Sequence, residues 1–266
     1  MKTQFGIVCL LDALGARSAS IATSQAYLRA LKHLRKEIHG TLAVTLPDDP
    51  KKRADARLLA QLRPRFFGDS ILMTYAVRSP RSFDDYFSRM TFTLIALVTE
   101  ALNKGVLFRG AIAIGDYIES SDVVLGPAIV DAANWYDKLD QVGIMCTPAA
   151  TTYLKAEFTN DSDTFNEERP GNWLVLYDAP INNGGTVRTY LLNWPDCAAG
   201  IHCATAEESP LKWFYRRLRT VPTPPGTESK HQNTEAFFRK QIIYFNAQKK
   251  ADHRTQASSA RGKPPR

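Results

Sequence analysis

The most constraining feature of this sequence is a pair of apolar runs that flank Gly68 and Asp69. The runs, 65–67 and 70–76, are separated by two residues that favour a tight turn, a pattern typical of a β-hairpin. A further apolar run at 5–11 ends in Asp12. Both aspartates therefore stand where a strand meets a turn. If these strands are neighbours in one sheet, the two carboxylates emerge at the same edge.

Two carboxylates at one sheet edge have a definite chemistry. They are hard oxygen ligands, which can hold a pair of Mg²⁺ ions for phosphoryl transfer. The alternative is that Asp12 and Asp69 are ordinary turn residues, since Asp is common in turns. These two positions alone leave both interpretations open.

Composition limits the class of protein. With 266 residues, 44% of them hydrophobic, the chain can bury a sizeable core, and one large α/β domain with appendages is expected. No run approaches the ~18 apolar residues of a membrane span. The N-terminus enters a strand almost at once, without the pattern of a signal peptide. We therefore expect a soluble, cytoplasmic protein.

Charge and cysteine content are less decisive. The net charge of +7 suits a polyanionic ligand, which could be a nucleotide, a nucleic acid or a membrane surface. Four cysteines are too few for a disulfide scaffold. Cys9 and Cys146 lie in apolar runs and are expected to be buried, and the spacing of Cys197, His202 and Cys203 matches no zinc pattern.

The order of elements predicts the fold class. Apolar spacing indicates a helix over 20–39 and a stronger one over 84–104, followed by a strand over 106–115. The first six elements thus read β-α-β-β-α-β, which predicts an α/β (α+β) protein with a ferredoxin-like sheet and helices on one face. Later segments predict further elements: a helix from 127 to about 139, strands 142–146, 173–177 and 187–194, and helices 148–154, 211–219 and 234–249.

These elements suggest three parts of the chain. Residues 1–200 would form one α/β domain that carries the candidate site, and 201–250 a C-terminal helical extension. Residues 251–266 are basic and lack bulky apolar side chains, so we expect a disordered tail.

Arg109 is the most unusual residue of the strand over 106–115. Alternation places it with Ala111 and Ala113 on one face, and these small neighbours leave open space over the guanidinium. Such an arginine could bind a phosphate or a carboxylate. It could equally be paired structurally with a nearby aspartate.

Four segments together carry a resemblance. Residues 11–15 (LDALG), 67–70 (FGDS), 109–115 (RGAIAIG) and 126–133 (GPAIVDAA) resemble, in order and spacing, the serial motifs of class III nucleotidyl cyclases. The last segment, with Trp135, Tyr136 and the later Gly143 and Ile144, is most similar to the bacterial pyrimidine cyclases of Pycsar antiphage systems. Each motif is weak alone, but four in sequence are fairly specific, and they cover residues 5 to about 150.

The resemblance implies roles for individual residues. Asp12, Asp69 and the carbonyl of Ala13 would hold two Mn²⁺ or Mg²⁺ ions per site. Leu14, Gly15, Ala16 and Arg17 match the segment whose N–H groups hold the triphosphate, and Leu10 is placed with these substrate-binding residues. Arg65 matches the position of a base-reading lysine. Arg109 and Asn134 are the further catalytic candidates.

The departures from the pattern also bear on function. Adenylate cyclases have Asn and Arg where this chain has Val130 and Asn134, so the arginine that stabilises the transition state is absent from its usual place. Arg109, Arg17 and Lys138 are candidates to replace it. The place of the adenine-reading Asp holds Val123, which argues against an ordinary adenylate cyclase. The resemblance implies UTP, or alternatively CTP, as substrate.

The same resemblance implies partners, and two other functions compete with it. It implies a homodimer with the strand of Arg109 and the helix after Gly126 near the interface, and a separate effector that the cyclic nucleotide activates for antiviral defence.

One alternative function is a nucleotide sensor that lost the chemistry. The other is a nucleic-acid-binding or polymerase-type palm, but the core shows no obvious basic-aromatic groove, so we expect no stable nucleic-acid complex.

Overall fold

The computed structural model describes residues 2–14, 61–79, 83–120, 123–157, 173–182, 184–203, 208–221 and 226–243, together with Gln25, Leu28, Arg29, Lys32 and Thr223. Of the helix expected over 20–39, only those first four isolated positions are described, and they are helical. The tail expected over 251–266 lies outside the described residues.

Four strands form one side of the sheet. They are β1 (Thr3–Leu14), β2 (Arg63–Phe67), β3 (Ser70–Ala76) and β4 (Leu107–Glu119). Their order is β2-β3-β1-β4, and every neighbouring pair is antiparallel. This is the strand order of a ferredoxin-like sheet, so the predicted fold class is confirmed. The predicted hairpin is confirmed too, with Gly68 at a φ of 61° in its turn, a conformation that glycine adopts without strain.

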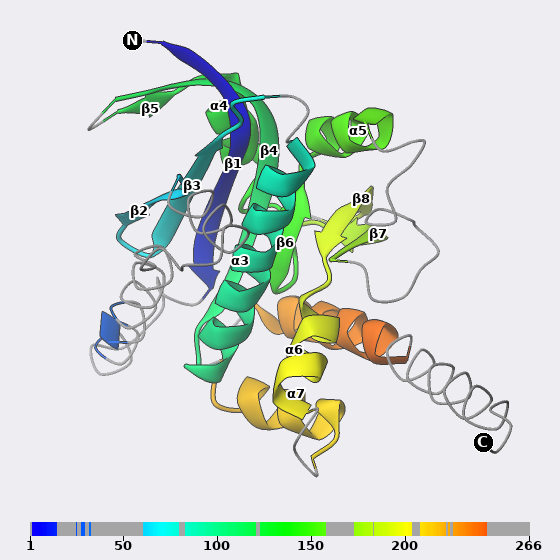
Figure 1. The fold of residues 1–266 in the computed structure, drawn as a ribbon. Coiled ribbons are helices and arrows are strands. Elements are labelled where there is room, and N and C mark those ends of the chain that lie inside the picture. The colour runs from blue at the N-terminus through cyan, green and yellow to red at the C-terminus, as the bar shows by residue number, and fades with distance from the viewer. Residues whose placement is uncertain are drawn as a thin grey trace, which may run out of the picture.

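The sheet continues beyond β4 (Figure 1). Next to it lie β6 (Gly143–Cys146), which runs parallel to β4, then β8 (Thr186–Leu192) and β7 (Leu174–Pro180). The two-residue strand β5 (Val124–Leu125) pairs with the far end of β4. The structure therefore has the extra strands that the sequence predicts, in one mixed sheet.

The two faces of the sheet are covered differently. The long helix α3 (Phe83–Asn103) packs on one face, where Ile7, Cys9 and Leu11 of β1 join the main core. The short helix α4 (Pro127–Trp135) packs against β4 and β1 on the other face, where Val8 joins a separate small cluster. Strand alternation explains the division, because successive side chains of β1 point to opposite faces.

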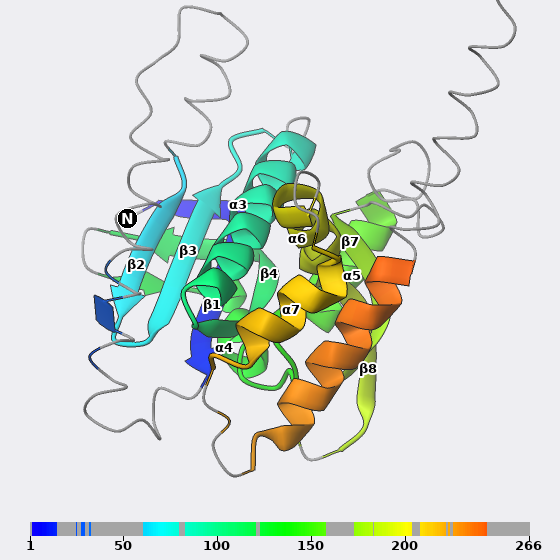
Figure 2. The ribbon, with the colours of Figure 1, turned by 90° about the horizontal axis from the view of Figure 1, so that it is seen from below.

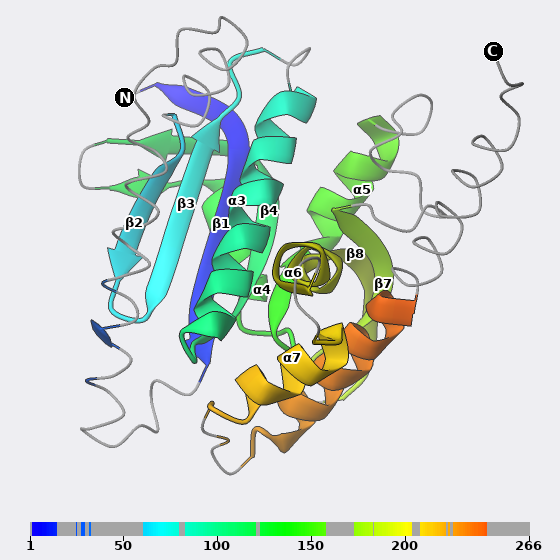
Figure 3. The ribbon, with the colours of Figure 1, turned by 60° about the horizontal axis from the view of Figure 1, so that its bottom comes forward.

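Helices after the sheet complete the main core. They are α5 (Pro148–Glu157), α6 (Trp194–Cys203), α7 (Pro210–Leu218) and a C-terminal helix described over 228–243. Figure 2 shows α7 beside the C-terminal helix, and Figure 3 shows both lying at one end of the molecule near α6. Phe214 of α7 stacks on Phe238 with 4.2 Å between the ring centroids, and Trp194 of α6 contacts both rings.

Several element boundaries differ from the expectation, and one element was not expected. Strand β4 continues to Glu119 rather than ending at 115, and the C-terminal helix is described from residue 228 rather than 234. Helix α4 ends at Trp135 because residues 136–142 form turns, where Leu139 makes an isolated bridge with Ile181. Helix α5 continues to Glu157. Helix α6 was missed because its ten residues include Pro, Gly, Asp and two Cys, and they show no clear apolar period.

Two expectations about composition can be compared with the described residues. Cys9 and Cys146 are buried free thiols, as the apolar runs predict, and burial raises the pKa of both. Within the described ranges, no helix combines the length and apolar character needed to cross a membrane.

Candidate active site

Asp12 and Asp69 lie at the same end of two neighbouring strands. Asp12 is paired with Ser70 in the β1–β3 register, and Asp69 is the turn residue immediately before Ser70. The backbone N–H of Ala13 donates a hydrogen bond to the carbonyl oxygen of Asp69 over 3.2 Å. Asp12 is buried and Asp69 is partly exposed. The sheet therefore fixes the backbones of both aspartates beside one another.

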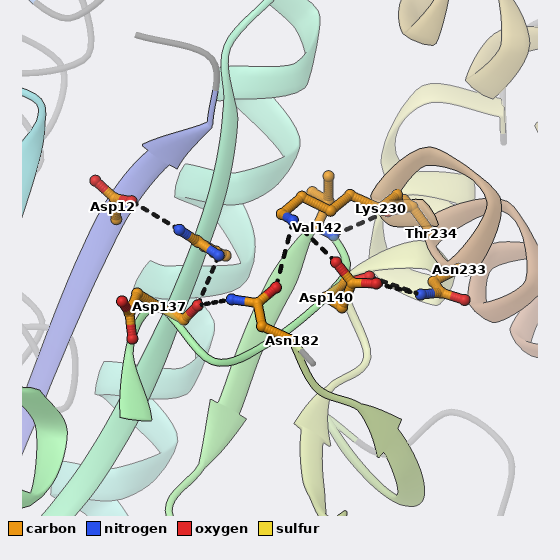
Figure 4. A network of polar contacts seen from close by, with 9 residues as sticks. Asp12, Asp137, Asp140, Val142, Asn182, Lys230, Asn233 and Thr234 are labelled. Carbon is orange, nitrogen blue, oxygen red and sulfur yellow. Dashed lines mark hydrogen bonds and ion pairs between the residues drawn. The ribbon is translucent and has the colours of Figure 1, made fainter. Parts of the chain in front are cut away.

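Arg109 is paired with Asp12. The two residues are opposite one another in the β1–β4 register, so their side chains leave the sheet on the same face. Nη2 of Arg109 lies 3.3 Å from Oδ2 of Asp12, and Nη1 donates to the carbonyl oxygen of Asp137 over 2.6 Å. Figure 4 shows these contacts between Asp12 and the loop after α4. Of the two interpretations of Arg109, the structure gives the pairing with an aspartate.

A second guanidinium–carboxylate pair involves Arg65. Its Nη2 lies 2.6 Å from Oε1 of Glu119, at the end of β4, and its Nη1 donates to the hydroxyl of Thr74 over 3.4 Å. The Thr74 hydroxyl in turn donates to Oε2 of Glu119 over 3.3 Å. Burial raises the pKa of the adjacent Tyr117, and Glu119 raises it further.

Both pairs are on the face of the sheet that carries α4. Arg65 is opposite Leu72 and Thr74 is opposite Val8, and Leu72 and Val8 belong to the cluster under α4. Arg109 and Glu119 are ten residues apart on β4, an even number, so alternation puts them on one face. Sequence reasoning singled out Arg65 but missed Glu119 and Thr74. Because Glu119 is an even number of residues from Arg109, the sequence could have indicated that both side chains lie on the same face.

The other predicted site residues have different environments. Leu10 packs against the small cluster under α4, whereas Leu14, the last residue of β1, packs against the main core. Asn134 is exposed on α4, and in the described part of the chain no polar contact joins it to Asp12 or Arg109. Gly15, Ala16 and Arg17 lie outside the described residues.

The oxygen donors near Asp12 determine what cation could bind there. Among the described residues, no three His, Cys, Asp or Glu side chains gather as a metal-binding group. A Mg²⁺ ion needs fewer protein ligands, because it is commonly held by one or two carboxylates together with substrate phosphates and water. Two aspartates and a nearby main-chain carbonyl therefore fit Mg²⁺ or Mn²⁺ in the presence of a phosphorylated ligand.

Comparison with known proteins gives a likeness to solved structures only. No protein-family model matches the chain, and no curated protein matches its sequence. The chain is similar to the catalytic core of a rhodopsin-guanylyl cyclase with converted specificity in complex with ATPαS, with a TM-score of 0.43 and 13% identity, covering 72% of this chain and 96% of that chain.

Two further solved structures are similar at the same level. An adenylate/guanylate cyclase/hydrolase from Silicibacter pomeroyi has a TM-score of 0.42 and 14% identity over 72% of this chain and 98% of that chain. A bacterial light-regulated adenylyl cyclase has a TM-score of 0.40 and 12% identity over 73% of this chain and 92% of that chain. At these identities, the roles of individual residues depend on the geometry of the site itself.

Proposed function

We propose that this chain is a nucleotidyl cyclase that converts UTP, or alternatively CTP, into the 3′,5′-cyclic monophosphate and pyrophosphate. One observation carries the proposal: Asp12 and Asp69 stand at the same end of adjacent antiparallel strands, with Ala13 bonded to the Asp69 carbonyl. Arg109, whose side chain lies on the same face as Asp12, would supply positive charge for a triphosphate.

The proposed cofactors are two Mn²⁺ or Mg²⁺ ions per site. Asp12, Asp69 and the Ala13 carbonyl would hold them, and the substrate phosphates would complete their coordination. When bound, these ions lower the pKa of the ribose 3′-hydroxyl and neutralise charge on the α-phosphate and the leaving pyrophosphate.

Arg109 would stabilise charge on the phosphates. Its Nη1 is anchored on the Asp137 carbonyl, whereas its contact with Asp12 is long at 3.3 Å. Nη2 can therefore turn from Asp12 to a phosphate oxygen without loss of the anchor. Backbone N–H groups of 14–17 would hold the triphosphate, as in other backbone anion nests. Arg17 and Lys138 are the other candidates for charge stabilisation, and Asn134 is a catalytic candidate from α4.

Arg65 and Glu119 would read the base. Together they present donors and an acceptor side by side, at 2.6 Å from one another. Uracil offers an acceptor at O4 and a donor at N3, and cytosine offers a donor at N4 and an acceptor at N3, so this pair complements either pyrimidine edge. Loss of the guanidinium in Arg65→Ala should change the ratio of UTP to CTP turnover more than it changes total turnover.

The proposed assembly is a homodimer with its sites at the interface. Exposed aliphatic side chains gather where β4, β5 and α4 meet: Ile118, Val123, Leu125 and Val130. Ile118 and Leu125 are directly opposite one another, so they form one continuous apolar surface. Covering this surface with a second copy would bury it. Leu125→Asp should convert the dimer into a monomer in light scattering and abolish turnover.

The proposed biological role is production of a second messenger in the cytoplasm. The cyclic nucleotide would activate a separate effector in antiviral defence. Co-expression of that effector with wild-type or Asp69→Asn protein in infected cells tests this role, because only the active enzyme should protect.

The biochemical test is incubation with each of the four ribonucleoside triphosphates and Mn²⁺, followed by chromatography of the products. Wild-type protein should give cyclic UMP or cyclic CMP. Asp69→Asn should give none while its circular dichroism spectrum and dimer mass stay unchanged. Asp178→Asn, which alters an exposed aspartate on β7, is the matched control and should keep full turnover. Full turnover by Asp69→Asn would refute the metal assignment.

One observation favours a non-catalytic nucleotide sensor as the second candidate. Asp12 is engaged by Arg109, and a guanidinium on this carboxylate can stabilise the fold without any bound cation. A sensor would bind a triphosphate and yield no product in the same assay. Tight binding of UTP with no cyclic product over a range of Mn²⁺ concentrations would decide for the sensor.

A further inference from the structure

The anchor of Arg109 is shared with a side chain from another part of the sheet. The carbonyl oxygen of Asp137 accepts a hydrogen bond from Nη1 of Arg109 over 2.6 Å and another from Nδ2 of Asn182 over 2.5 Å. A carbonyl oxygen has two lone pairs, so these two donors use its full capacity. The position of the Asp137 carbonyl, and with it that of Arg109, therefore depends on Asn182.

The orientation of Asn182 is in turn dictated by Lys230. Nζ of Lys230 donates to Oδ1 of Asn182 over 3.3 Å. A lysine ammonium has three donors and no acceptor, so the amide atom that faces it must be the oxygen. This leaves the Asn182 NH₂ group directed at the Asp137 carbonyl, as Figure 4 shows.

Lys230 is itself held firmly in the first turn of the C-terminal helix. Its Nζ donates to Oδ1 of Asp140 over 2.9 Å, and both side chains are only 14% exposed. Asn233, one turn further along, donates to Oδ2 of Asp140 over 3.1 Å and to its carbonyl over 2.9 Å. The backbone N–H of Val142 donates to the hydroxyl of Thr234 over 2.8 Å. The loop over 137–142 is thus attached to the C-terminal helix at several points.

We infer that Lys230 is a positioning residue of the active site. Through the oxygen of Asn182 and the carbonyl of Asp137, it fixes the guanidinium of Arg109 beside Asp12. Lys230 contacts Asp140 and Asn182, so it acts on Arg109 only through intermediate groups. Its effect on turnover depends on the proposed function, but its effect on Arg109 is a property of the folded chain alone.

Two variants separate this positioning role from general stability. Lys230→Met removes the donor that orients Asn182. Asn182→Asp keeps an oxygen for Lys230 but places an acceptor against the Asp137 carbonyl. The attachment of Lys230 therefore survives, while the carbonyl that holds Arg109 loses its hydrogen bond from Asn182 and is repelled by the new carboxylate. Lys230→Arg retains a cationic donor and serves as the conservative variant. Lys212→Met is the matched control, because Lys212 is exposed on α7.

The decisive measurement is the ¹⁵N spectrum of arginine side chains in the 266-residue chain without nucleotide or metal. The Arg109 signal is assigned with Arg109→Lys. We expect it to shift in Lys230→Met and in Asn182→Asp, to return toward its wild-type position in Lys230→Arg, and to stay unchanged in Lys212→Met. An unchanged Arg109 signal in folded Asn182→Asp protein would overturn the inference, whether or not Lys230→Met folds.

Kinetics provide the second measurement. Misplacement of a charge-stabilising group lowers kcat more than it raises KM, so we expect Asn182→Asp to lose about tenfold in kcat with KM for UTP changed by less than about threefold. Equal loss in the control Lys212→Met would count against the inference. If wild-type protein makes no cyclic product at all, the proposed function fails while the arginine spectrum still decides the role of Lys230.

Discussion

The two arginine–carboxylate pairs on the α4 face of the sheet are alike in burial but unlike in geometry. Arg65 and Glu119 are 2.6 Å apart, and Thr74 bonds to both. Arg109 lies 3.3 Å from Asp12 and makes its shorter contact, 2.6 Å, with a main-chain carbonyl. Charge-assisted bonds are usually about 2.7–2.9 Å long, so only the first pair is close.

This difference suggests different uses of the two carboxylates. Glu119 is expected to stay paired with Arg65, because separating the two would leave two poorly hydrated charges without a partner. Asp12 could bind another cation in place of the Arg109 guanidinium, because Arg109 would keep its hydrogen bond to the Asp137 carbonyl after leaving Asp12. Under the proposed function, the pair at Asp12 would open to bind metal, and the pair at Glu119 would form a fixed surface that recognises the base.

Metal removal should give the largest contrast between the two pairs. We expect EDTA to abolish formation of the cyclic product and added Mn²⁺ to restore it. Mn²⁺ at a hundred times its Kd should add about 2.7 kcal/mol to the unfolding free energy of wild-type protein. Asp12→Asn should lose this stabilisation in thermal denaturation and Glu119→Gln should keep it. The reverse pattern would place the exchangeable carboxylate at Glu119.

Lysine in place of each arginine gives the next largest effect. Lysine cannot span two acceptors as the guanidinium fork does. We expect Arg109→Lys to lower kcat for UTP about 100-fold, the scale found for loss of one charge-stabilising donor. Arg65→Lys should change the ratio of UTP to CTP turnover with a much smaller loss of kcat. Equal losses of kcat in steady-state assays would show that the two arginines have one common role.

Replacing each carboxylate with its neutral amide should lower the unfolding free energy by different amounts in the two pairs. Glu119→Gln leaves a largely buried guanidinium without its close partner, and we expect a loss of about 2 kcal/mol in unfolding free energy. Asp12→Asn should cost about 1 kcal/mol or less, because Arg109 retains the Asp137 carbonyl. Urea denaturation of the metal-free protein measures both. A larger cost at Asp12 would contradict the distinction between an exchangeable and a committed carboxylate.

Asp196 on α6 is a reference carboxylate outside the two pairs. We expect its replacement to give the smallest change in unfolding free energy. Burial raises its pKa to about 6, and no ion pair is found for it among the described residues. The unfolded chain ionises first as pH rises, so the carboxylate lowers stability progressively from about pH 4 to pH 6, and fully above that range. Because Asp196 is only partly buried, Asp196→Asn should add about 1 kcal/mol at pH 8.

The same variant should be neutral near pH 4 in thermal denaturation, where the native carboxyl is protonated. An equal gain at pH 4 and pH 8 would mean that desolvation of the charge is not the cause. Asp12→Asn should show no such gain at pH 8, because its carboxylate has a cation beside it.

The sequence determined much of the fold because local signals agreed with one another. Gly68 and Asp69 between two apolar runs specified the hairpin. Alternation around Arg109 correctly placed Phe108 and Ile112 in the main core and Ala113 under α4, whereas Ala111, expected on the face of Arg109, belongs to the main core. The apolar stripe of α3 was recognisable for the same reason. Helix α6 was not, because its packing around Trp194 depends on α7 and the C-terminal helix rather than on its own pattern.

The candidate site divides in the same way. Residue type and turn position were enough to single out Asp12 and Asp69, and strand alternation singled out Arg109. Arg65 was singled out only by the resemblance to class III cyclases. Only the tertiary structure decided the partners: Asp12 for Arg109, Glu119 for Arg65, and the relay from Lys230 through Asn182 to the Asp137 carbonyl. The physical reason is that a turn or an alternating strand is encoded over a few residues. A charge pair between residues 54 or 97 positions apart forms only once the strands are paired in their native register.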